Sequence, residues 1–222
     1  MKFKYLLKQI SPPIFVTIYR RLFENKSYVF EGVYKNLTSV PIQKETYKDE
    51  SYVKEISLPL SKIEDVSQVN FYFTIDLRGL FHYQFLPFLI ATIKKENKKI
   101  NILDFGGGAA IGYISCKHFS SKDNLKFHII ETNEFVKVAK KITKNNNQVE
   151  WHNDLPKVLG SVDILNIGSS LQYIDNYVEK LIELIKYQPK YILFTDIHFG
   201  TSKTFATKQN NIKNQSIACW VF

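Results

Sequence analysis

A glycine-rich segment at the end of an apolar run contains the first residues of this sequence that could do chemistry. It reads NILDFGGGAAIGY over residues 101–113, and Asp104 stands two positions before the triplet Gly106, Gly107 and Gly108. Glycine adopts positive φ in tight turns, and its missing Cβ lets a ligand approach the backbone closely. A helix beginning behind the turn would add free N–H groups and the positive end of its dipole. The segment predicts a site for a phosphate, a dinucleotide or a nucleoside-type cofactor, and a tight turn without a ligand is the alternative.

The spacing of the glycines distinguishes between the binding motifs of these ligands. A phosphate-binding P-loop needs G-x-x-x-x-G-K-[ST], and no lysine follows Gly112, which excludes that motif. A dinucleotide fingerprint needs G-x-G-x-x-G, whereas Gly106, Gly108 and Gly112 give G-x-G-x-x-x-G. Asp104 would repel a pyrophosphate and would attract a cation such as an amino acid ammonium. S-adenosylmethionine (SAM) carries an ammonium and a sulfonium and no phosphate, so these residues favour SAM.

A second carboxylate stands at the end of the next apolar run. This residue is Glu131, the last of LKFHIIE over residues 125–131. A carboxylate at that place can accept hydrogen bonds from both ribose hydroxyls of an adenosine cofactor, and NAD sites use the same arrangement. Glu131 therefore supports an adenosine cofactor without separating SAM from NAD. An NAD(P)-dependent oxidoreductase or nucleotide-sugar enzyme stays open as an alternative.

The elements that must position these residues alternate regularly from residue 100 onward. Strand-like apolar runs alternate with helical patterns, which predicts βαβ units on a mostly parallel sheet and a Rossmann-like, doubly wound α/β fold. Ligands of such sheets bind beyond the carboxyl ends of the strands, which is where the glycines and Glu131 lie. The expected strands are residues 100–105, 125–131, 148–152, 162–168 and 190–197, and the expected helices are residues 109–119, 133–147 and 175–188.

The N-terminal part of the chain lacks this regular alternation. Residues 1–80 are expected to form a partly helical N-terminal extension, and residues 81–222 the cofactor-binding domain. In the first part we expect a helix over residues 3–24, interrupted at Pro12-Pro13, and a strand over residues 69–75. A helix over residues 82–99 would lead into the first strand of the sheet.

The C-terminal part looks short for this fold. After Ile197 only 25 residues remain, which is too few for a helix of about a dozen residues and two strands of about five with their turns. We therefore expect one strand, or a strand followed by the start of a helix, within residues 215–222, together with an incomplete final hairpin and an exposed sheet edge. The chain would then be a truncated gene product, or another subunit would cover that edge.

Several of these residues resemble a known motif. The segment ILDFGGG, followed by an acidic residue at the end of the second strand, resembles the cofactor motif of class I SAM-dependent methyltransferases, with Ala110 in place of a frequent third glycine. A closer resemblance is to a family of bacterial methyltransferases associated with surface-polysaccharide gene clusters. The segments that carry it are FEGVYKNL (30–37), LDFGGG (103–108), DLP (154–156), GSSLQYI (168–174), KQN (208–210) and ACWVF (218–222).

This resemblance implies methyl transfer from SAM. Our first hypothesis is a SAM-dependent methyltransferase that acts on a small-molecule or glycan-type acceptor, in surface-polysaccharide biosynthesis. The implied cofactor-binding residues each have a structural alternative, such as a helix cap, a turn residue or a buried amide. They are Asp104, Gly106, Gly107 and Gly108 at the methionine end, Glu131 at the ribose, Asp154 and Leu155 near the adenine, and Ser169 and Gln172 facing the methyl group and substrate.

No catalytic residue is assigned from the sequence, because methyl transfer needs positioning and only sometimes a general base. The candidates for a base are His82, Tyr83, Tyr173, Asp196 and His198. The remaining histidines, His118, His128 and His152, are expected to be structural. The His, Cys, Asp and Glu residues show no metal-ligand spacing, so no metal is expected.

The composition of the chain bears on its partners and on its cellular compartment. The net charge is +9, and residues 1–99 hold 16 Lys and Arg against 10 Asp and Glu. This basic part is a lysine-rich solvated face or a contact for an anionic partner, including the surface of a membrane. No apolar run is long enough for a membrane span, and two distant cysteines, Cys116 and Cys219, fit a reducing cytoplasm.

Other partners follow from the same reasoning. Nucleic acid is not expected, because NIGSSLQY stands where a nucleic-acid methyltransferase would carry an NPPY-like segment. An oligomer is expected if a subunit covers the sheet edge. A catalytically degenerate methyltransferase fold that serves as a partner protein is the non-enzymatic alternative.

Overall fold

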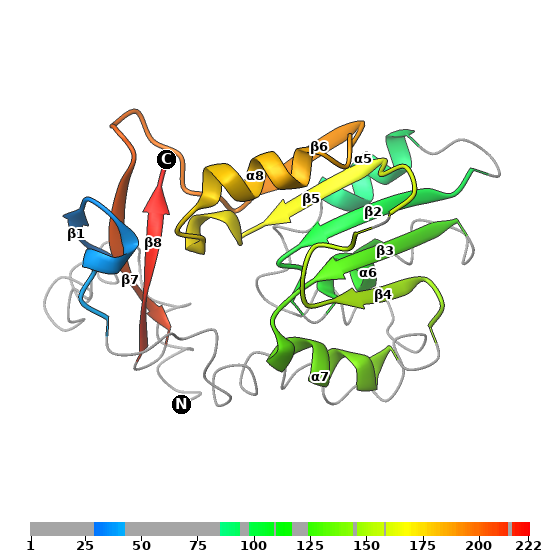
Figure 1. The fold of residues 1–222 in the computed structure, drawn as a ribbon, viewed down its shortest axis with the longest axis horizontal. Coiled ribbons are helices and arrows are strands. Elements are labelled where there is room, and N and C mark those ends of the chain that lie inside the picture. The colour runs from blue at the N-terminus through cyan, green and yellow to red at the C-terminus, as the bar shows by residue number, and fades with distance from the viewer. Residues whose placement is uncertain are drawn as a thin grey trace, which may run out of the picture.

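The structure is a computed structural model. The chain forms two β-sheets, and helices surround the larger sheet (Figure 1). The expected helix over residues 3–24, the strand over residues 69–75 and the boundary at residue 80 lie outside the described residues. None of the described helices has the length and apolar character that crossing a bilayer requires. The described residues are 29–42, 85–93, 98–108, 110–116, 124–143, 146–157, 159–212 and 215–222.

The larger sheet has five strands, and every neighbouring pair in it is parallel. Its order is β4-β3-β2-β5-β6, so the chain winds outward from β2 in one direction and then from β5 in the other. This confirms the predicted Rossmann-like, doubly wound fold, with its switch point between β2 and β5. The strands are β2 (Ile100–Phe105), β3 (Leu125–Ile130), β4 (Val149–His152), β5 (Ile164–Gly168) and β6 (Tyr191–Thr195).

Helices cover both faces of this sheet (Figure 1). On one face, Ile90 and Ile114 of two helices pack against Ile102 and Phe127 of the sheet. On the other face, Leu184 of α8 packs among side chains of β2 and β5. The central strands β2 and β5 are buried on both faces, which explains why their sequences are nearly continuous apolar runs. The helices are α5 (Phe85–Ile93), α6 (Ile111–Cys116), α7 (Asn133–Ile142) and α8 (Tyr177–Ile185).

A buried carboxylate holds the beginnings of β2 and β5 together. Asp163 precedes β5, and its Oδ2 accepts a hydrogen bond from the backbone N–H of Asn101 at 3.0 Å. Its Oδ1 forms an ion pair with Lys190, just before β6. Burial opposes ionisation of Asp163, but the hydrogen bonds and charges of Lys190 and Asn101 hold its pKa below the usual value. The carboxylate therefore stabilises the fold above pH 4 and loses this contribution as the pH falls through its lowered pKa.

We expect Asp163→Asn to lower the free energy of unfolding at pH 7 by about 1–3 kcal/mol, because it weakens a charged hydrogen bond in a buried setting. Urea unfolding of both chains measures the difference. The exposed Asp175 gives a matched control, and Asp175→Asn should change the free energy of unfolding by less than about 0.5 kcal/mol. Equal effects of the two substitutions would contradict this role.

The smaller sheet corrects the prediction of an incomplete C-terminal hairpin. Strands β7 (Phe205–Ile212) and β8 (Gln215–Val221) form a complete antiparallel hairpin. The chain has enough residues because the connection over residues 196–204, which is described throughout, contains no helix. The hairpin pairs with β1 (Phe30–Tyr34), in the order β1-β7-β8, and not with β6. The strand expected within residues 215–222 is confirmed.

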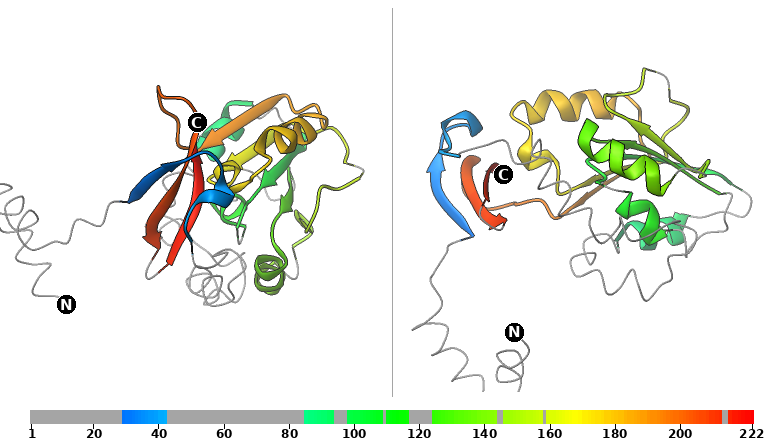
Figure 2. Two further views of the ribbon diagram at one scale, coloured as in Figure 1. Left: turned by 60° about the vertical axis from the view of Figure 1, so that its left-hand side comes forward. Right: turned by 90° about the horizontal axis from the view of Figure 1, so that it is seen from below.

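The smaller sheet stands at the C-terminal ends of the parallel strands, as Figures 1 and 2 show. The indole N–H of Trp220 donates to the carbonyl of Ile174 at 3.0 Å. The ring of Tyr177, at the start of α8, contacts the rings of Trp220 and Phe222. The hairpin is therefore packed against the short 3-10 helix η5 (Leu171–Tyr173) and the loop that follows β5.

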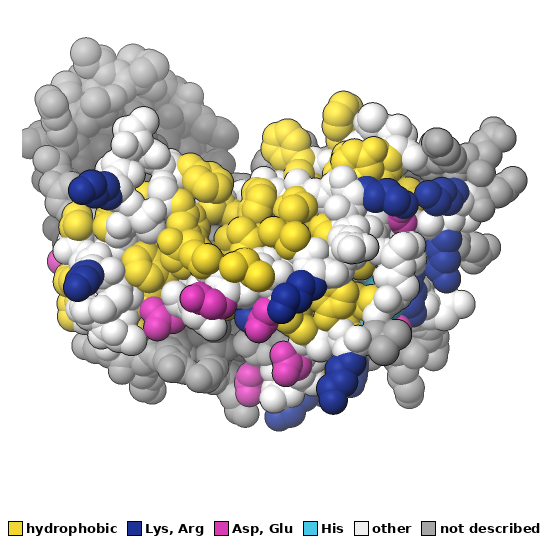
Figure 3. All heavy atoms as spheres, turned by 45° about the horizontal axis from the view of Figure 1, so that its top comes forward, with side chains coloured by type: hydrophobic (Ala, Val, Ile, Leu, Met, Phe, Trp, Pro, Cys, Tyr) yellow, Lys and Arg dark blue, Asp and Glu magenta, His cyan; other side chains and the backbone are white. Residues whose placement is uncertain are grey.

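The expected exposed edge of the larger sheet is present in the described residues. Strand β6 is the last strand of the sheet, and its Tyr191, Ile192 and Phe194 side chains are exposed. Val178 and Ile182 of α8 are exposed as well. Figure 3 shows hydrophobic side chains gathered on the face to which these elements belong. A subunit that covers this edge stays a prediction.

Candidate functional site

The nine predicted cofactor-binding residues all belong to the C-terminal ends of parallel strands or to the loops that follow them (Figure 1). Such ends share one edge of the sheet, so the predicted residues come from four neighbouring strands at one edge. Asp104 lies in β2 and Gly106, Gly107 and Gly108 follow it, Glu131 follows β3, Asp154 and Leu155 follow β4, and Ser169 and Gln172 follow β5.

Asp104 is fully buried beneath the glycine turn. Its Oδ1 accepts a hydrogen bond of 2.7 Å from the side-chain amide of Asn166, which stands opposite it in β5. Its Oδ2 has no hydrogen-bond partner among the described residues. A Cβ at Gly107 would lie 2.5 Å from this Oδ2, and a Cβ at Gly112 would lie 2.9 Å from it. The two glycines are therefore needed so that the turn and α6 can close over the carboxylate.

Burial controls the protonation of Asp104. It raises the pKa of the carboxyl to about 7, while the hydrogen bond from Asn166 acts in the opposite direction. The negative charge of Glu131 raises this pKa further. A cation that approaches the unpaired oxygen of a buried carboxyl favours the ionised form and lowers the pKa of that carboxyl. Asp104 is thus poised to respond to a positively charged ligand near neutral pH.

Glu131 joins the end of β3 to the glycine turn. Its Oε1 accepts from the backbone N–H of Gly108 at 3.1 Å, and its Oε2 accepts from the N–H of Thr132 at 2.6 Å. Burial raises the pKa of Glu131, and these two hydrogen bonds oppose the increase. A carboxylate has about four acceptor positions, so two remain for hydroxyl groups. Gly108 has a φ of 57°, and a Cβ there would meet nothing nearer than Ile111 Cδ1 at 4.0 Å.

The loop after β5 packs directly on the glycine turn. The hydroxyl of Ser170 donates to the carbonyl of Phe105 at 2.8 Å. A Cβ at Gly106, whose φ is 71°, would lie 2.3 Å from the Cβ of Ser170. Ser169 itself has a φ of 51°. Close packing therefore explains Gly106, and Ser169 is a turn residue whose contacts to a ligand remain a prediction.

Gln172 links two loops at this edge. Its side chain is fully buried, and the amide Nε2 donates to the carbonyl of Asp196 at 3.1 Å and to the hydroxyl of Ser169 at 3.3 Å. Its Oε1 has no hydrogen-bond partner among the described residues. Gln172 therefore holds the loop after β5 against the loop after β6, with one buried acceptor unused.

Backbone strain gathers at the same edge. Four non-glycine residues in the described part of the chain have positive φ. Three of them, Ala110, Ser169 and Asp196, lie in the loops that follow β2, β5 and β6. Such conformations cost energy and cluster at ligand sites, where the surroundings hold them in place.

The remaining predicted residues lie farther along this edge. Asp154 is exposed, and its Oδ1 accepts from the N–H of Leu155 at 2.8 Å. Leu155 is partly buried against the apolar cluster beneath α8. Asn153, just before them, donates its side-chain amide to the carbonyl of Glu131 at 3.4 Å. The loop after β4 is thus tied to the Glu131 backbone, and the adenine contacts of Asp154 and Leu155 stay predictions.

The structure places three of the five candidate bases, while His82 and Tyr83 lie outside the described residues. The Tyr173 hydroxyl donates to Gln209 of β7 at 3.0 Å. The ring of His198 makes an edge contact with Phe30 of β1, with ring centroids 4.8 Å apart. Both residues therefore face the smaller sheet, and Asp196 is held by its loop contacts.

Sequence reasoning missed Asn166 and Ser170, which the strand register and the turn bring to the site.

Comparisons with known proteins bear on the fold. No protein-family model matches this sequence, and a search of curated proteins gives no significant match. Among solved structures, human N-acetylserotonin methyltransferase in complex with SAM is 16% identical, with a TM-score of 0.45, over 69% of this chain and 40% of that chain. The plantazolicin methyltransferase BpumL in complex with S-adenosylhomocysteine (SAH) is 16% identical, with a TM-score of 0.42, over 67% of this chain and 62% of that chain.

A third solved structure, PKMT2 from Rickettsia typhi, is 17% identical, with a TM-score of 0.37, over 49% of this chain and 24% of that chain. This chain spans less than two thirds of the length of each of these three proteins. At such identities the likeness concerns the arrangement of strands and helices. The first two of these proteins are described as methyltransferases.

Proposed function

We propose that this protein is a SAM-dependent methyltransferase that transfers a methyl group to a small-molecule or glycan-type acceptor. The observation that carries the proposal is the buried Asp104 carboxylate, which lies directly beneath the glycine turn with one oxygen unpaired. A pyrophosphate placed at this turn would meet a negative charge. An ammonium placed there would meet a charge of opposite sign.

The residues fit the remaining parts of this cofactor. The two free acceptor positions of Glu131 suit a pair of ribose hydroxyls, and the open side of Gly108 lets a ligand approach the backbone. When bound, SAM supplies an electrophilic methyl group on its sulfonium. The chain has to orient the acceptor and exclude water. We assign Ser169 and Gln172, on the loop after β5, to the acceptor side, and Asp154 and Leu155 to the adenine.

The acceptor class and the cellular setting of this protein follow from its sequence. A glycan acceptor in surface-polysaccharide biosynthesis rests on the resemblance of short segments such as FEGVYKNL and GSSLQYI. A cytoplasmic location rests on the cysteines, and Cys116 and Cys219 are both free and buried. We further propose peripheral membrane contact through the basic N-terminal segment, and an oligomer in which β6 is covered.

Isothermal titration of the full chain with SAH tests the cofactor. We expect a Kd in the micromolar range, and we expect Glu131→Gln to weaken binding tenfold or more, because a hydrogen bond to a charged group contributes about 1.5–3 kcal/mol. Glu134→Gln, three residues later on α7, is the matched control and should leave the Kd unchanged. Binding of NAD or NADP in place of SAH would contradict the proposal and favour the oxidoreductase.

A catalytically degenerate fold that serves as a partner protein is the second candidate. It is favoured by the placement of the described candidate bases, since Tyr173 bonds to Gln209 and His198 contacts Phe30 of the smaller sheet. SAH binding without methyl transfer to any acceptor would support this candidate. A folded chain that binds neither SAH nor a nicotinamide cofactor would support it as well.

A further inference from the structure

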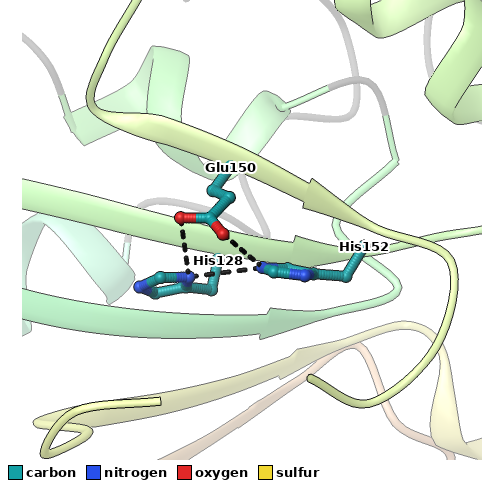
Figure 4. A group of neighbouring side chains, drawn as sticks. All are labelled: His128, Glu150 and His152. Carbon is teal, nitrogen blue, oxygen red and sulfur yellow. Dashed lines mark hydrogen bonds and ion pairs between the residues drawn. The ribbon is translucent and has the colours of Figure 1, made fainter. Parts of the chain in front are cut away.

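Three side chains of metal-ligand type meet on the outer part of the parallel sheet. Strand β3 contributes His128, and β4, the edge strand, contributes Glu150 and His152. Parallel pairing places His128 opposite Glu150 and Ile130 opposite His152. Because alternate residues of a strand share a face, all three side chains project from the same face. Figure 4 shows them converging from the two strands.

The distances between the ligand atoms are those of a metal site. His128 Nδ1 lies 3.3 Å from His152 Nε2. Glu150 Oε2 lies 3.6 Å from His128 Nδ1, and the other carboxylate oxygen, Oε1, lies 3.8 Å from His152 Nε2. In a tetrahedral zinc site with Zn–N distances of about 2.0–2.1 Å, neighbouring ligand atoms are about 3.3–3.4 Å apart. The two nitrogens already have this separation. The ligand atoms of the three side chains lie within 4.8 Å of one another, so one carboxylate oxygen has to turn toward the nitrogens when a metal binds.

The charge state of the cluster also suits a cation. Burial lowers the pKa of His128 and of His152, although the charge of Glu150 opposes this shift. Neutral imidazole is the form that binds metals. One cation competes for the carboxylate, because Lys126 Nζ lies 3.3 Å from Glu150 Oε2. This ammonium also donates to the carbonyl of Asn147 at 3.1 Å, so it keeps a partner when the carboxylate turns away.

We propose that His128, Glu150 and His152 bind a divalent transition metal of the zinc class, with a fourth position open to water or another ligand. Two imidazoles and one carboxylate are a set that zinc accepts. His128 is paired with Leu103 of β2, and paired residues of neighbouring strands share a face of the sheet. Asp104 is the next residue of β2, so its side chain points to the other face. The histidine cluster and Asp104 therefore lie on different faces of the sheet, although the backbone N–H of Glu131 donates to the carbonyl of His152 at 3.0 Å. Metal binding at this site does not depend on methyltransferase activity. A bound ion would link the edge strand β4 to β3 and stabilise their pairing.

Titration of the untagged full chain with ZnCl₂, followed by isothermal calorimetry, tests this site, and Co²⁺ replaces Zn²⁺ for visible absorption. We expect one ion per chain with a micromolar or lower Kd, and a Co²⁺ spectrum of four-coordinate intensity. His128→Gln and His152→Gln should each weaken zinc binding at least tenfold, and Glu150→Gln should weaken it as well. Lys126→Gln should tighten binding, because it removes the competing ammonium.

Glu183→Gln, on α8, is the matched control for Glu150→Gln and should leave the zinc affinity unchanged. Circular dichroism of each variant establishes that the chain is folded before titration. No binding below 1 mM zinc would overturn the proposal. An affinity that both histidine variants retain, or a Co²⁺ spectrum of six-coordinate intensity, would overturn it too.

Discussion

Gly107→Ala should destabilise this protein by about 3 kcal/mol and abolish SAH binding. The added Cβ would lie 2.5 Å from Asp104 Oδ2, 2.7 Å from Asp104 Cγ and 2.8 Å from Ile129 Cγ2. Neither side chain has room to retreat, because both are fully buried and Asp104 is hydrogen-bonded to Asn166. Overpacking of a close-packed core costs about 1–3 kcal/mol, and more where neighbours cannot move. Urea unfolding at pH 7 measures the loss of stability.

Gly108→Ala separates packing from ligand binding. Its φ of 57° costs an alanine about 1 kcal/mol, but the added Cβ would enter open space near Ile111 only. We expect this variant to stay folded with a modest loss of stability and to bind SAH at least tenfold more weakly, because the Cβ occupies the ligand's side of the turn. If Gly108→Ala bound SAH like the parent chain, the ligand would not lie against this turn.

The parallel sheet could be predicted because most of its strands are short apolar runs bounded by turn residues. Of the smaller sheet, β8 could be predicted as a strand, but β7 could not. Strand β7 reads FATKQNNI, and its buried Thr207 and Gln209 are polar. These residues are satisfied by partners from distant segments, as when the Thr207 hydroxyl donates to the carbonyl of Gly32, 175 residues away, at 2.8 Å. Hydrophobicity along the chain does not reveal such a strand.

Site residues could be predicted where their type and their position at the end of a strand mark them. They could not be predicted where only the pairing of two strands brings them to the site. Asp104 and Glu131 could be found because a carboxylate at the end of a buried strand is unusual. Asn166 lies inside the apolar run ILNIG, and only the pairing of β2 with β5 places it opposite Asp104. The histidine cluster was missed for the same reason. His128 and His152 are 24 residues apart, and no local spacing marks them as ligands.

The affinity of this chain for SAH should rise about tenfold between pH 6 and pH 8. Burial raises the pKa of Asp104 from 3.8 to about 7 in the free protein. Below pH 7 the carboxyl is neutral, so the ammonium of SAH finds no charge and binding must first remove a proton. Above pH 7 the carboxylate is ionised and attracts the ammonium at no such cost. A group that is one-tenth ionised at pH 6 and nine-tenths ionised at pH 8 gives the tenfold difference.

The stability of the free protein should change in the opposite direction. A carboxyl whose folded pKa is raised stabilises the fold fully below its unfolded pKa, near 3.9, and this contribution is lost as the pH rises through about 7. A shift of this size amounts to about 4 kcal/mol. Asp104→Asn removes the titrating group, so the parent chain should lose stability relative to the variant between pH 4 and pH 7, and their difference should stay constant above pH 8.

Two measurements decide whether Asp104 is the group that responds. Calorimetric titration of SAH at pH 7 in buffers of different ionisation enthalpy should detect the release of about half a proton, because binding ionises a carboxyl that is half protonated at its pKa. Asp104→Asn should abolish this release and flatten the affinity between pH 6 and pH 8. If the variant kept the tenfold rise, another group would be titrating, and Glu131, which also has a raised pKa, would be the next to replace. If affinity fell with rising pH, the ammonium would not lie near either carboxylate, and the cofactor would have to approach the glycine turn in another orientation.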